Sequence, residues 1–233
     1  MFALTTLTHV RALGLSLGVA ASQGASASIG NLGFLGVPLL VGLFGDRGAG
    51  PLAIAMVCEL GVITFASVAL MAINQGKSAA ISNALNVALL NPILGAVLIG
   101  LLLSAAGTPL PASVDRFLAV SGAAAGPTSL FALGAALAAR QNGENFALQT
   151  AGVVLGKLLI YPAIVGVILH FVLNIDPFYV QAGMLIAALP TAGSVFAIAQ
   201  HHNAEPERAS AAVLATTAVA MMSFPAMAWL VMH

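Results

Sequence analysis

Long apolar runs, interrupted only by short charged turns, constrain this chain more than any other feature. Its 233 residues include 7 basic and 7 acidic side chains, so that charged residues make up 6% of the chain and hydrophobic residues 60%. Soluble domains carry about 25% charged residues, and so few charges cannot cover the surface of a water-soluble globule of this length. The composition therefore indicates an integral membrane protein. It argues against an ordinary cytosolic enzyme, a disordered regulator and, because the net charge is zero, a nucleic-acid binder.

Eight segments are long and apolar enough to cross a membrane. A transmembrane helix needs about 20 mostly apolar residues, and nearly every charge of this chain falls in the short loops between such segments. No remaining segment is long enough for a soluble second domain. We therefore expect an all-α polytopic membrane protein with about eight transmembrane helices in a single domain, residues 1–233. The expected spans are 10–27, 28–45, 48–72, 84–106, 113–139, 146–172, 178–200 and 209–232.

Two prolines near the middle of expected spans indicate broken helices. Pro38 ends the sequence NLGFLGVP, and Pro190 begins the sequence PTAGS. A proline removes a backbone hydrogen bond and clashes with the carbonyl four residues earlier, here those of Phe34 and Ile186. Discontinuous helices in corresponding positions of two halves point to the binding site of a transporter. The half-helix ends at such a site could hold an anion at free N–H groups or a cation at free carbonyls.

Two ionisable residues, Glu59 and Lys157, also fall in mid-span. At 1.5 Å per residue, each lies about 16 Å from the start of its span, close to the membrane midplane. Their helices enter from opposite sides, so the two side chains could meet. One hypothesis makes Lys157 the counter-charge for a substrate carboxylate and Glu59 a proton-coupling group. The other is a structural ion pair, or a lysine that extends to the membrane surface.

Catalytic and metal sites leave no comparable pattern. Ser121, Ser129 and Ser194 have the side chain of a nucleophile, but no histidine lies in mid-span to act as their base. His201 and His202 are adjacent, and no third metal ligand accompanies them. We therefore expect a protein that is not an enzyme, with no catalytic residues, no metal and no cofactor.

Four stretches, in order along the chain, resemble the auxin efflux carrier family of permeases. They read NLGFLGVPLLVGLFGDRG, NPILGAVLIGLLLSAAGTPLP, GPTSLFALGAALA and AALPTAGSVFAIAQHH, and the likeness runs from about Gly30 to Trp229. The resemblance implies ten helices in two inverted five-helix repeats, two broken helices that cross at the midplane beside the substrate, and an elevator-like alternating-access motion. The substrate-binding residues that it implies are Asn31, Gly36 and Pro38 in the first broken helix, with Pro190, Thr191 and Ser194 in the second.

The chain departs from the family pattern at its start. Family members begin with two further helices, so the resemblance implies a truncated first repeat over about residues 1–73 and a complete second repeat over residues 84–233. Three explanations are open: a start codon assigned too late, a degenerate gene, or a genuine eight-helix variant.

The resemblance also implies a function. Members are secondary transporters or uniporters, and we expect transport of a small organic anion, auxin-like or a dicarboxylate, by a multi-pass protein of the cell membrane (the inner membrane in a bacterium). The expected partners are the lipid bilayer, the anion, H+ or Na+ as a candidate coupling ion, and a second copy in a homodimer, with no nucleic acid. Two alternatives remain: a transport-inactive membrane remnant or subunit that needs a partner chain, and, less favoured, an intramembrane enzyme.

Overall fold

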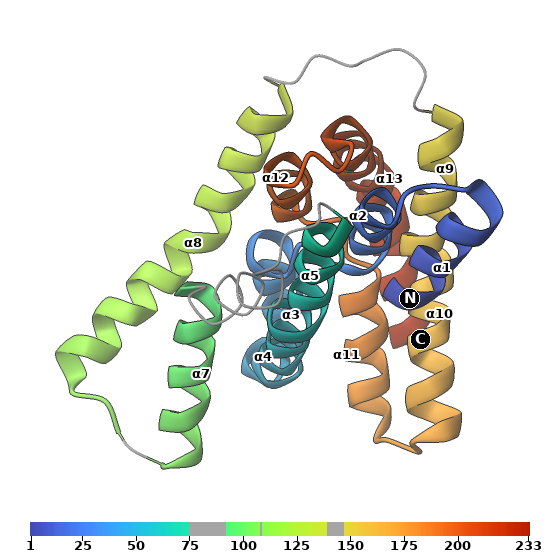
Figure 1. Ribbon diagram of the computed structural model, residues 1–233. Helices are drawn as coiled ribbons and strands as arrows, with labels where there is room; N and C mark the ends of the chain where they lie inside the picture. Colours follow the sequence, from blue (N-terminus) through green and yellow to red (C-terminus); the bar gives the residue numbers. More distant parts are fainter. Residues whose placement is uncertain (75–91, 108, 139–146) are drawn as a thin grey trace.

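The computed structural model describes residues 1–74, 92–107, 109–138 and 147–233, and in these residues it is built of helices without strands (Figure 1). The all-α prediction is thereby confirmed. The α-helices are α1 (Phe2–Leu13), α2 (Leu17–Ser28), α3 (Val37–Phe44), α4 (Ala49–Met56), α5 (Thr64–Asn74), α7 (Pro92–Ala105), α8 (Ala112–Ala138), α9 (Ala147–Leu155), α10 (Tyr161–Val167), α11 (Pro177–Ala187), α12 (Gly193–His201) and α13 (Pro206–Met232). Shorter π-helical segments are η1 (Leu32–Gly36), η3 (Val57–Ile63), η4 (Gly156–Ile160) and η5 (Ile168–Val172), and η2 (Gly45–Gly48) is a 3-10 turn.

Within the described residues, three helical stretches are long and apolar enough to cross a membrane, namely Leu32–Asn74, Thr150–Val172 and Pro206–Met232. The first of them turns at η2, where Gly45 has a positive φ of 61°. Two shorter apolar helices, Gly95–Ala105 and Pro177–Ala187, accompany them. The chain therefore has several apolar helices, as a polytopic membrane protein requires.

Most expected spans coincide with helices. The span 48–72 matches α4 to α5, 113–139 matches α8, 146–172 matches α9 to η5, 209–232 matches α13, and 178–200 covers all but the first residue of α11 and the last residue of α12. Only the second part of the span 84–106 can be compared, because its first residues lie outside the described ones.

The expected span 10–27 is wrong, because the chain does not form one helix there. The helix α1 ends at Leu13, where Gly14 takes a left-handed conformation with a φ of 63°. The next helix, α2, begins at Leu17, and the Ser16 hydroxyl caps it by accepting from the N–H of Val19 at 3.4 Å. Nearly every residue of α2 is buried, because its glycine, alanine and serine side chains let neighbouring helices approach closely.

The helices α2 and η1–α3 are the two halves of an interrupted helix rather than an antiparallel pair. The first half packs mainly against α1 and α5, whereas α3 packs against η2, η1 and α4. The helices α11 and α12 are interrupted in the same way, between Ala187 and Gly193.

The two interruptions cross each other near the centre of the molecule. The N–H of Asn31 donates to the carbonyl of Pro190 at 2.8 Å, and the N–H of Ala192 donates to the carbonyl of Ile29 at 3.1 Å. Gly30 and Thr191 thus form an antiparallel bridge. Backbone groups at membrane depth must find partners within the protein, and here each broken helix supplies partners for the other.

Of the two prolines expected at breaks, Pro190 lies at one and Pro38 does not. Pro38 lies beyond the break, in the first turn of α3. Before it, in η1, the N–H groups of Gly36 and Val37 donate to carbonyls five residues back. This wider turn accommodates the missing N–H of a proline without ending the helix. The carbonyl of Ile186, expected to be free, accepts from the N–H of Leu189 at 3.2 Å.

The helices α7 and α8 extend along one side of the molecule (Figure 1). The first packs against η3 and α4, and the second against η1. Both therefore touch segments that lead to the crossing.

The packing of the turn η2 against α3 can be tested by substituting a glycine. A Cβ added to Gly48 would lie 2.6 Å from the carbonyl oxygen of Leu40, whereas a Cβ on Gly50 would meet nothing within 4 Å. We expect Gly48→Ala to lower the stability by about 1–3 kcal/mol, as overpacking does. Gly50→Ala, its matched control within α4, should leave stability unchanged or raise it by up to about 1 kcal/mol. Thermal unfolding in detergent measures both, and equal midpoints would contradict the close approach of η2 to α3.

Candidate functional site

A cavity of about 160 Å3 lies at the crossing of the two broken helices. Its walls are the first break and the start of η1 (residues 29–34), the side chains of Met56, Glu59 and Leu60, and the start of α12 (residues 192–194). It brings together three of the residues singled out in the sequence: Asn31, Ser194 and Glu59.

Asn31 offers this cavity a hydrogen-bond donor. Its side chain is 3% exposed. The Oδ1 atom accepts from the N–H of Phe34 at 3.3 Å and so caps η1, whereas the Nδ2 atom has no hydrogen-bond partner among the described residues. A buried polar group without a partner costs about 1–3 kcal/mol. The site therefore gains if a bound molecule supplies an acceptor.

Two helix N-termini face the same cavity. The segment η1–α3 begins at Leu32, and α12 begins at Gly193, and both starts line the cavity. No side chain caps α12. The first N–H groups of a helix have no partner within it, and the helix dipole places partial positive charge there. The cavity is therefore suited to an anion.

Glu59 reaches the crossing from η3. Its side chain is 5% exposed. The Oε2 atom accepts from the N–H of Gly30 at 2.8 Å, whereas no residue that the structure describes forms a hydrogen bond with Oε1. One carboxylate oxygen thus holds the backbone of the break, and the other is free.

Lys157 approaches the crossing from η4. Its side chain is fully buried, so it does not extend to the membrane surface. Its ammonium donates to the carbonyl of Ser28 at 3.2 Å and lies 4.7 Å from the ring centroid of Tyr161. Lys157 does not line the 160 Å3 cavity.

Gly30 lies where the two charged side chains converge. A Cβ on Gly30 would stand 3.4 Å from Lys157 Nζ and 3.5 Å from Glu59 Oε1. Within the described residues no direct ion pair joins the two groups. The two side chains therefore interact across the backbone of the break. The carbonyl of Ser28 binds Lys157, and the N–H of Gly30 binds Glu59.

The backbone N–H of Thr191, like that of Gly30, donates to a side chain of another helix. Its N–H donates to the hydroxyl of Thr216 at 3.0 Å, and its own hydroxyl donates to the carbonyl of Ser26 at 2.6 Å. Thr216 lies ten residues after the start of α13 at Pro206, as Glu59 lies ten residues after the start of α4 at Ala49. Thr216, Ser26 and Gly30 were not predicted from the sequence. An alignment of α4–η3 with α13, each the next helix after a broken one, could have pointed to Thr216.

The other sequence-predicted residues do not line the cavity. The packing of η1 requires Gly36 to be small, since an added Cβ would lie 3.1 Å from the side chains of both Leu189 and Leu52. Pro190 supplies the carbonyl that Asn31 binds. Among the described residues, no group of three or more His, Cys, Asp or Glu side chains could hold a metal ion.

Comparison with known proteins identifies the family of the chain. A family described as "Membrane transport protein" matches residues 10–228. The chain belongs to this family. The resemblance to the auxin efflux carriers, which are members of it, is confirmed. A protein of Rhizobium meliloti (strain 1021) named "Putative malonate transporter" is 29% identical over 217 residues, which cover 91% of this chain and 67% of that protein. Family and relative indicate a membrane transporter rather than an enzyme.

The buried charges at the crossing can be tested by a double-mutant cycle. Lys157→Met should lower the stability by about 3–5 kcal/mol, because it leaves a buried carboxylate without its neighbouring cation. Combining it with Glu59→Gln should recover most of that loss. Thermal unfolding in detergent gives all three values, with Arg116→Met as control, since Arg116 is exposed on α8. Strictly additive effects of the two changes would show that the two side chains do not interact.

Proposed function

We propose that this membrane transporter carries a small organic anion, a short dicarboxylate, through the cavity at the crossing. The observation that supports this most strongly is the unpaired Nδ2 of Asn31, buried in a cavity that also receives two helix N-termini. A substrate carboxylate would accept from Asn31 and from the free N–H groups at Gly193 and Ser194. Hydrogen bonds to a charged group are worth about 1.5–3 kcal/mol.

The size of the cavity favours a dicarboxylate of few carbons over an auxin-like molecule. Pockets for drug-sized ligands measure about 300–1,000 Å3, whereas this cavity measures about 160 Å3. The name of the relative from Rhizobium meliloti, which refers to malonate, agrees with this preference.

In this proposal the predicted residues fall into two groups. Asn31 and Ser194 touch the anion. Gly36, Pro38, Pro190 and Thr191 hold the crossing that shapes the cavity. The division into a first repeat over residues 1–73 and a second over residues 84–233 is part of the same proposal. It is supported by the matched hydrogen bonds from Gly30 to Glu59 and from Thr191 to Thr216.

Transport by the purified protein in liposomes tests the proposal. We expect uptake of labelled malonate above that of empty liposomes, and little uptake of indole acetate. Asn31→Ala removes the unpaired donor and should raise the KM for malonate by about 10- to 100-fold, the equivalent of one lost hydrogen bond to a charge. Gln200→Ala is the matched control, because it removes an exposed amide from α12 that does not line the cavity.

Two results would contradict the proposal. Folded protein that moves no short dicarboxylate would rule out the substrate class. An unchanged KM in Asn31→Ala would show that the anion binds elsewhere.

A further inference from the structure

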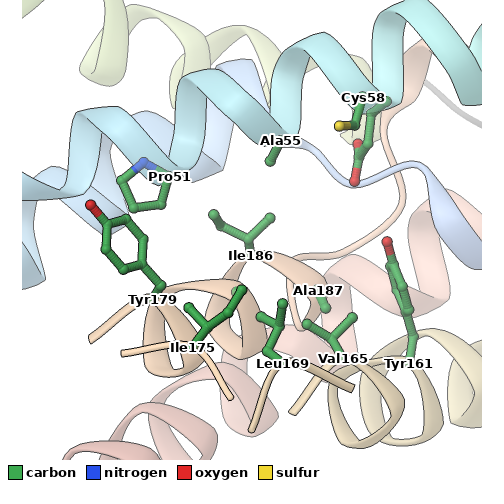
Figure 2. A pocket seen from close by; sticks show the side chains of 12 residues that line it. Pro51, Ala55, Cys58, Tyr161, Val165, Leu169, Ile175, Tyr179, Ile186 and Ala187 are labelled. Atoms are coloured by element: carbon green, nitrogen blue, oxygen red, sulfur yellow. The ribbon is translucent and has the colours of Figure 1, made fainter. Parts of the chain in front are cut away.

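A second, larger cavity approaches Glu59 from another direction. It measures about 540 Å3 and lies between α4–η3, α10–η5 and α11 (Figure 2). Its walls are mostly apolar, with Cys58, Tyr161 and Tyr179 as further polar side chains. Of the residues that line the two cavities, Glu59 alone is common to both. A single buried carboxyl thus has access to two separate spaces.

The ionisable groups around Glu59 are few. Lys157 approaches from η4 and Tyr161 from α10, and Cys58 precedes Glu59 on η3. Tyr179 of α11 lines the larger cavity. The helices α2, α5 and α7 and the segment η1 contain no Asp, Glu, Lys, Arg, His, Cys or Tyr. In the part of the chain that the structure describes, the charged side chains that bind the backbone of the crossing are Glu59 and Lys157.

Protonation of Glu59 would change how the small cavity treats an anion. With Glu59 ionised, its charge and that of Lys157 cancel, and the carboxylate of Glu59 belongs to the wall of the same cavity as Asn31. A substrate carboxylate would then meet a like charge where little water screens it. With Glu59 neutral, the repulsion disappears and the positive charge of Lys157 is left uncancelled. Anion binding and proton binding would therefore favour each other.

The geometry allows Glu59 to gain and lose a proton while its hydrogen bond to the crossing stays in place. The N–H of Gly30 donates to Oε2, an interaction that a carboxylic acid can accept as well as a carboxylate. The proton can therefore reside on Oε1. In the other half of the molecule, the hydroxyl of Thr216 accepts from Thr191, and this group does not titrate.

We propose that Glu59 is the site of a proton that is transported together with the anion, and that this proton reaches Oε1 through the larger cavity. An O–H bond forms at Oε1 when a proton is taken from water on one side, and it breaks when the proton is given to water on the other side. One H+ then moves with each anion, in the same direction. The inference rests on the proposed function, and it specifies the coupling ion.

The experiment follows malonate and protons together in liposomes that contain a trapped pH dye. Wild-type protein should accumulate malonate against its gradient when the outside is more acidic, and the lumen should acidify as malonate enters. A protonophore should abolish the accumulation. Glu59→Gln keeps an oxygen for the N–H of Gly30 but cannot release a proton. It should lose acid-driven accumulation and lumen acidification, and its exchange of labelled for unlabelled malonate should no longer depend on pH.

Thr216→Val is the matched control, because it removes the corresponding acceptor at the crossing without removing a titratable group. Any loss of rate in this variant should be the same at every pH, and acid should still drive accumulation. A merely structural role of Glu59 predicts the same behaviour for Glu59→Gln.

The outcomes separate the two proposals. Wild-type protein that takes up malonate in net amounts without acidifying the lumen, or that is driven by Na+ instead of acid, overturns the role of Glu59 and leaves the proposed function intact. The same follows if Glu59→Gln still accumulates malonate in response to acid. Absence of any malonate exchange by folded wild-type protein overturns the proposed function, and the proton site with it. Even if Glu59→Gln does not fold, the dye measurement on wild-type protein shows whether a proton moves with malonate.

Discussion

The rest of the structure depends on the exchange of backbone hydrogen bonds between two interrupted helices. Residues 29–31 and residues 190–192 each leave their own helix, and each supplies a donor and an acceptor to the other. In a membrane interior no water is at hand to replace these partners. Once the two breaks are tied to each other, two helix starts face one small space. The cavity, the two helix starts that line it and the buried amide of Asn31 all follow from this arrangement.

The same constraint explains why charged side chains can lie at the crossing. Segments that have left their helices carry backbone groups that need partners, and Glu59 and Lys157 bind such groups at Gly30 and Ser28. Burying a charge is costly unless hydrogen bonds and an opposite charge compensate it. Here each charge has a backbone partner and a neighbour of opposite sign. The glycine between them matters because a larger residue at position 30 would occupy the space in which the two groups approach each other.

Particular residues show how much of the structure could be predicted from the sequence. The apolar spans were predictable because lipid demands about 20 apolar residues for each crossing, and the mid-span positions of Glu59 and Lys157 followed from the length of their helices. Pro190 was rightly expected at a break. Pro38 was not, because the π-helical turn before it absorbs the missing N–H. The span 10–27 was misread because an α2 made of small residues looks weakly hydrophobic, although it is among the most buried helices of the chain.

The sequence by itself determined that this chain is an all-helical membrane protein of the auxin efflux carrier type, because composition and local motifs are sufficient for that conclusion. It also marked Asn31, Ser194 and Glu59, which come together at the cavity. Only the tertiary structure decided that Gly30 and Thr191 pair, that Lys157 binds the carbonyl of Ser28 and that Glu59 borders two cavities. Some of these are contacts between segments more than 100 residues apart. The cavities are lined by residues of several separate helices. Such contacts depend on how the helices pack, which no local pattern encodes.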